Sequence, residues 1–67
     1  EHIVRFLDDP HSPHAREIKW ASASSMAHAL SVAASEWPEI RRSHGPSAGY
    51  VIEDPRGHRV FVMPLRR

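Results

Sequence analysis

Short runs of β-branched and aromatic residues lie near both ends of the chain and flank one longer segment with helical periodicity. His2 to Leu7 predicts a first strand, because it is rich in such residues. Ala15 to Trp20 alternates as a half-buried strand does, with Ile18 and Trp20 on one side and Glu17 and Lys19 on the other. The first two strands therefore form a hairpin with a long, proline-containing loop.

The middle of the chain predicts one amphipathic helix. Its apolar positions are spaced by four, three and four residues, which places them on one stripe: Met26, Leu30, Ala33 and Trp37. Ser22 or Ser24 is suited to cap the helix by accepting a backbone N–H. Pro38 disfavours helical dihedrals at the residue before it, so the helix should end or kink there, with Ile40 extending the stripe if a further turn follows.

The segment from Tyr50 to Met63 predicts a second hairpin, which completes the order strand, strand, helix, strand, strand. One helix can cover one face of an antiparallel sheet, so we expect a single two-layer α+β domain over residues 1–67 with a mainly antiparallel four-stranded sheet. The expected core consists of these residues: Val4, Phe6, Ile18, Trp20, Met26, Leu30, Ala33, Trp37, Ile52 and Val60.

The turn of the second hairpin has specific chemistry, because Asp54-Pro55-Arg56-Gly57 matches the preferences of a type I turn. If Gly57 closes a bulge, the predicted cross-strand pairs are Glu53–Arg59, Ile52–Val60, Val51–Phe61 and Tyr50–Val62. In that register Val51, Phe61 and Met63 share the face that the helix does not cover.

Both faces of the predicted sheet would then be apolar, and uncovered apolar surface often marks an association site. We therefore expect a non-enzymatic interaction module that binds another protein or a second copy of itself. Its interface would have Val51, Phe61 and Met63 at the centre, with Glu53 and Arg59 at the rim. Alternatively, the first loop or the Trp37–His44 segment folds over this face.

Nucleic-acid binding is the second hypothesis, and the charge of the chain gives it only limited support. The chain of 67 residues has a formal net charge of +1, whereas nucleic-acid-binding domains are usually more basic. Two arginine pairs, Arg41-Arg42 and Arg66-Arg67, could still bind phosphates. The simpler interpretation is ordinary surface charge balanced by nearby carboxylates.

Metal binding is the third hypothesis, because the first loop brings together ligand-type side chains: Asp8, Asp9, His11 and His14. Spacing alone is weak support, and a polar turn accounts for the same residues. His28 with Ser24 and Ser31 could pair a base with a nucleophile, but no third group or oxyanion hole is evident. We expect no enzyme activity and no cofactor.

Two further absences bear on location. The chain has no cysteine, which suits a reducing cytoplasm. No apolar run approaches the roughly 18 residues of a membrane-spanning helix, so we expect no membrane partner.

The layout resembles that of small bacterial strand-strand-helix-strand-strand domains of unknown function. The matching parts are the strand Ile3–Leu7, the alanine-rich helix Ser25–Glu36 and the turn Asp54–Gly57. The resemblance extends over nearly the whole chain and implies a bacterial α+β domain, but it assigns no functional residue.

Overall fold

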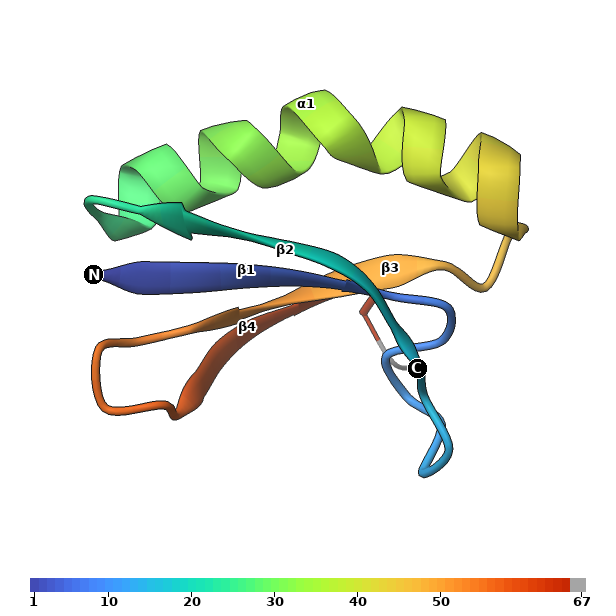
Figure 1. Cartoon of the computed structure of the whole chain (residues 1–67), viewed down its shortest axis with the longest axis horizontal. Helices are drawn as coiled ribbons and strands as arrows, with labels where there is room; N and C mark the ends of the chain where they lie inside the picture. Colours follow the sequence, from blue (N-terminus) through green and yellow to red (C-terminus); the bar gives the residue numbers. More distant parts are fainter. Residues whose placement is uncertain (66–67) are drawn as a thin grey trace.

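The computed structural model describes residues 1–65 and shows one helix packed on a four-stranded antiparallel sheet (Figure 1). The element order is strand, strand, helix, strand, strand, so the predicted two-layer α+β fold is confirmed. The elements are β1 (His2–Leu7), β2 (Glu17–Ala23), α1 (Met26–His44), β3 (Gly49–Glu53) and β4 (Arg59–Met63).

The sheet order is β2-β1-β3-β4, which places the first and third strands in the centre and the other two at the edges. β1 pairs antiparallel with both β2 and β3, and β3 pairs antiparallel with β4. The first and last hairpins are thus joined through β1 and β3, while α1 makes the connection between them. Both edge strands end the hydrogen-bonded ladder, so their outer backbone groups have no strand partner among the described residues.

The helix is longer than the sequence predicted. It begins after Ser25, whose side chain accepts a hydrogen bond from the His28 N–H (3.1 Å), so neither Ser22 nor Ser24 is the cap. It continues through Pro38 to His44, so of the two predicted alternatives the helix does not end at Pro38, and buried Ile40 extends the apolar stripe. Pro38 is exposed, while its neighbours Trp37 and Ile40 are anchored in the core. Tertiary packing on both sides of the proline therefore maintains the helix at this point.

The core lies between α1 and the near face of β1 and β3. Val4, Phe6 and Ile52 are fully buried there, as predicted. An aromatic cluster organises its centre: the Tyr50 ring stacks on Phe61 with a centroid distance of 6.1 Å and meets Trp37 edge-on at 5.5 Å. Burial raises the pKa of the Tyr50 hydroxyl, because the ionised form would be poorly solvated.

Most of the remaining predicted core residues take part in this core, but two do not. Ala33 is fully buried, and the following side chains are partly buried against the core: Ile18, Met26, Leu30 and Trp37. Trp20 is 57% exposed and Val60 is 48% exposed, so their assignment to the core is wrong. Trp20 lies on edge strand β2 directly opposite Arg5, on the side of the sheet away from the helix.

The last hairpin has a bulge that the sequence analysis did not place. Glu53 pairs with Arg59 as predicted, but Ile52 pairs with Phe61, so Val60 is an extra residue in β4. An extra residue reverses the alternation of the side chains that follow it. Phe61 and Met63 therefore lie on the helix side, beside Ile52 and Tyr50, and the predicted register is wrong beyond the first pair.

Candidate interaction surface

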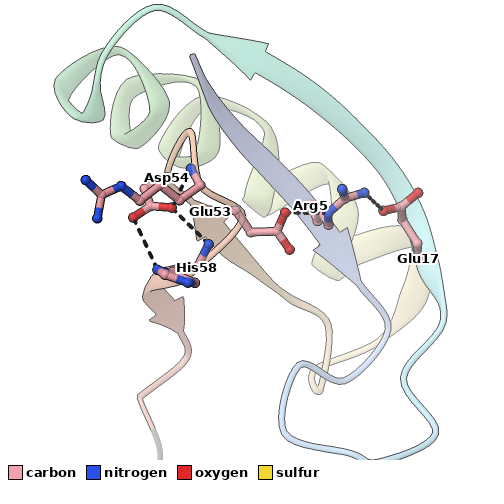
Figure 2. A network of polar contacts seen from close by, with 6 residues as sticks. Arg5, Glu17, Glu53, Asp54 and His58 are labelled. Carbon is pink, nitrogen blue, oxygen red and sulfur yellow. Dashed lines mark hydrogen bonds and ion pairs between the residues drawn. The ribbon is translucent and has the colours of Figure 1, made fainter.

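The face of the sheet away from α1 is polar at its centre, not apolar as predicted. Arg5 lies between two carboxylates from the neighbouring strands, 2.7 Å from Glu17 on β2 and 3.1 Å from Glu53 on β3 (Figure 2). These contacts raise the pKa of Arg5, first through its hydrogen bond with Glu17 and then through that with Glu53. The row of three charged side chains crosses three strands and suits a surface that stays in water.

The first loop covers one end of the same face. Pro10 is buried, and a Cβ on Gly49 would meet its ring at 2.8 Å, so the loop lies against the start of β3. The His11 ring is hydrogen-bonded to the carbonyl of Pro64. The alternative that the loop folds over this face is therefore correct for the end near Leu7, which is itself buried.

The centre of the predicted interface is consequently not available as a group. Val51 does lie on the face away from the helix, but it is fully buried between its cross-strand neighbours Arg5 and Val62. Phe61 and Met63 lie on the opposite face. The three residues do not form one surface, and the predicted interface needs a different geometry.

Apart from Trp20 on β2, the exposed apolar surface of the sheet follows the edge strand β4. The backbone of the helix lies close to β1, β2 and β3 but not to β4 within the described chain, and β4 is the strand farthest from it in Figure 1. Phe61 and Met63 pack against the core and are half-buried. Val60 and Val62 add an exposed and a half-buried side chain. We call these four residues, Val60 to Met63, the β4 strip.

The opposite edge strand, β2, has a different character. Lys19 forms an ion pair with Glu36 of the helix, and Glu17 forms the ion pair with Arg5. A bulge interrupts the pairing of β2 near Ile18. Charged side chains and bulges are features that discourage edge strands from pairing with another chain. The β4 strip has no charged residue, although it begins with the bulge at Val60.

The hairpin turn that leads into β4 is tightly organised. The Asp54 side chain accepts hydrogen bonds from the backbone N–H groups of His58 (2.9 Å) and Arg56 (3.0 Å), as Figure 2 shows for His58. Gly57 donates to the Asp54 carbonyl at 2.9 Å and has a φ of 85°, a conformation that glycine adopts without strain. The hydrogen bonds from His58 and Arg56 to the Asp54 carboxylate lower its pKa, and the one from His58 has the largest effect. The predicted turn is thus confirmed, and it fixes where β4 begins.

The candidate metal ligands are used within the loop. Asp8 accepts from the Arg16 N–H at 2.8 Å, which closes the loop at its base, and Asp9 accepts from the His11 N–H at 3.1 Å. His14 is exposed. Across residues 1–65, no group of three His, Asp or Glu side chains is placed to hold a metal ion.

The first arginine pair lies at the end of the helix and is engaged there. Arg41 lies over the Trp37 ring, 5.3 Å from its centroid, and Arg42 forms a two-pronged contact with Glu39. Arg66 and Arg67 lie outside the described residues. The pairing of Arg42 with a carboxylate reduces the positive field that a phosphate would meet at this end of the molecule.

His28 has a structural position at the start of the helix. Its Nδ1 accepts from the Ser24 backbone N–H and lies at the same distance, 3.2 Å, from the Ser24 hydroxyl. The Ser25 hydroxyl accepts a hydrogen bond from the His28 backbone N–H. His28 is therefore bonded through its backbone to Ser25 and through its ring to Ser24, as in a reciprocal capping arrangement. The His28–Ser24 contact thus holds the segment just before the cap residue Ser25.

The described residues form no pocket, and none of their helices is long and apolar enough to cross a membrane. No known protein family matches the chain, and neither the curated proteins nor the solved structures include one with significant similarity to it. The surface itself is therefore the basis for any functional conclusion.

Proposed function

We propose that this protein is a small, non-enzymatic interaction module that binds another protein, or a second copy of itself, through the β4 strip. The observation behind this proposal is that Phe61 and Met63 pack on the core yet stay half-buried on a strand that α1 does not reach. Apolar side chains next to an unpaired strand edge are features that partner proteins use by strand addition. In keeping with the absence of cysteine, we place this module in the cytoplasm.

The chemistry of the edge supports a protein partner over a nucleic acid. The strip is formed by valine, phenylalanine and methionine, whereas nucleic-acid surfaces need clustered positive charge. Arg59, at one end of the strip, lies opposite Glu53 in the ladder, and of the predicted pair Arg41-Arg42, one member is already bound to a carboxylate.

Site-specific photo-cross-linking in cells of the native host tests this proposal. A photoreactive amino acid replaces Val60, which is exposed on β4, and in the matched control it replaces Ser35, which is exposed on the helix. Irradiated cells are lysed, and cross-linked products are identified by mass spectrometry.

We expect a protein product at position 60 and none above background at position 35. Equal cross-linking at the two positions, or none at position 60, would contradict the proposal, since exposure alone would then explain the data. A product that contains nucleic acid at either position would favour the second hypothesis.

A further inference from the structure

Building on this proposed function, we infer that the β4 strip pairs with the β4 strip of a second copy, which joins two sheets into one continuous eight-stranded sheet. The two copies would be related by a two-fold axis perpendicular to the sheet. The choice of a second copy, and not a different protein, follows from the pattern of residues along the strand.

The strip is self-complementary when it is paired antiparallel with itself. With Val62 placed on the two-fold axis, Val62 faces Val62, and Phe61 of each copy faces Met63 of the other. Phe61 and Met63 both lie on the helix side of the sheet, so each pair between Phe61 and Met63 of the two copies joins residues of the same face. If the axis passed through Phe61 instead, Arg59 would lie opposite Met63. These two side chains are on different faces of the sheet, because Arg59 shares the far face with Glu53 and Met63 lies on the helix side.

The charges of the strand permit this pairing as well. The strip contains no ionisable side chain, and the nearest one described, Arg59, lies three residues from the axis. The two copies of Arg59 would be about 20 Å apart at the rise of a β-strand, which is beyond the Debye length in physiological salt. The opposite edge cannot pair as favourably with itself, because Glu17 and Lys19 are both committed to ion pairs.

The pairing would give partners to two sets of groups in β4 that are exposed in the single chain. It would satisfy backbone groups at the outer edge of β4, and it would bury the exposed flanks of Phe61 and Met63 against one another. Because α1 does not extend over β4, the helices of the two copies would not collide above the new seam.

Light scattering on the purified chain and on charge variants tests the inference. Mass is measured from about 1 mM to about 1 µM for the wild type, for Val62→Lys, for Val62→Glu and for a mixture of the two variants. Ser22→Lys, an exposed change on the other edge strand, is the matched control. Circular dichroism confirms that each variant is folded.

We expect a wild-type dimer that dissociates on dilution and is unchanged by Ser22→Lys. Each Val62 variant should weaken association by about tenfold or more, because two like charges would meet on the axis, and the mixture should regain it. A wild-type chain that stays monomeric at every concentration would overturn the inference, as would association that Val62→Lys leaves intact.

If the Val62 variants fail to fold, the wild type supplies the answer by another route. In a mixture of isotope-labelled and unlabelled chains, isotope-filtered NMR should show contacts between Phe61 of one copy and Met63 of the other. Contacts at β2 or at the Arg5 face would overturn the inference.

This outcome is distinguishable from that of the cross-linking experiment. A monomeric wild type that cross-links to a different protein at position 60 rejects the second copy and keeps the interaction module. The absence of any product at position 60 rejects both.

Discussion

The two edge strands of this sheet differ in how far their exposed edges are protected from pairing with another chain. β2 has charged side chains that form ion pairs with the helix and with Arg5, and a bulge interrupts its ladder. β4 has four consecutive apolar residues, the first of which is the bulged residue Val60, and the backbone of the helix does not come close to it. This difference is the basis of our proposal that the protein binds a partner at one edge only. The predictions below test this difference between the edges.

The largest effect should come from the seam between β3 and β4. A Cβ at Gly49 would lie 2.0 Å from the backbone oxygen of Met63, a contact that no side-chain movement can relieve. We expect Gly49→Ala to lower the free energy of unfolding by about 3 kcal/mol, because the strands must separate at this end. Denaturant unfolding of this variant, with the exposed Ser47→Ala as control, measures the cost. An unchanged midpoint would show that β4 is not held as described.

Next, one aromatic residue from each edge can be compared directly. Phe61 is half-buried against Tyr50, whereas Trp20 is mostly exposed on β2. Phe61→Ala should cost about 2 kcal/mol, less than a fully buried phenylalanine, and Trp20→Ala should change stability by less than about 0.5 kcal/mol. Both values are measured by urea unfolding at low protein concentration, where association contributes nothing. Equal losses would remove the distinction between the two edges.

A smaller effect is expected from the charged row beside β2. Arg5→Met leaves Glu17 and the more buried Glu53 without their cation, so we expect a loss of about 1 kcal/mol. The loss should shrink in high salt, because ions screen partly exposed charges. Arg16→Met, at an exposed arginine of the first loop, is the control and should have no salt-dependent cost. A loss from Arg5→Met that is the same at all salt concentrations would indicate lost packing instead.

The smallest effect concerns the turn that sets the start of β4. The folded state lowers the pKa of Asp54, so its carboxylate stabilises the fold above the unfolded-state pKa and loses this effect as pH falls through the folded-state value. We expect Asp54→Asn to weaken the pH dependence of stability below about pH 4. Acid titration followed by circular dichroism, with Asp8→Asn for comparison, measures it. Identical acid curves for Asp54→Asn and the wild type would contradict this account.

Local chemistry made much of the fold predictable. The order of elements follows from alternation in the strands and from the four-three-four spacing in the helix, and the Asp54–Gly57 turn follows from its residue types. The pairing of Glu53 with Arg59 follows directly from that turn. These features depend on residues close together in the sequence.

The predictions that were wrong concern features that depend on contacts between residues far apart in the sequence. The helix passes Pro38 because Trp37 and Ile40 are held by the core, and no local signal reveals that support. The bulge at Val60 moves Phe61 and Met63 to the helix side of the sheet. The residue types of β4 give no sign of this bulge. Sheet order decides which strands are edges, so the candidate surface could be found only after β4 was placed outside β3.

We propose that β4 is the edge that binds a second copy, whereas charged side chains protect β2. Amide hydrogen exchange, resolved by residue with NMR and repeated from low to high protein concentration, tests it most directly. We predict that amides of Val60 to Met63 gain protection as concentration rises, while those of Glu17 to Ala23 do not change. Protection gained on β2 instead, or the same exchange rates for β4 at every concentration, would contradict the account.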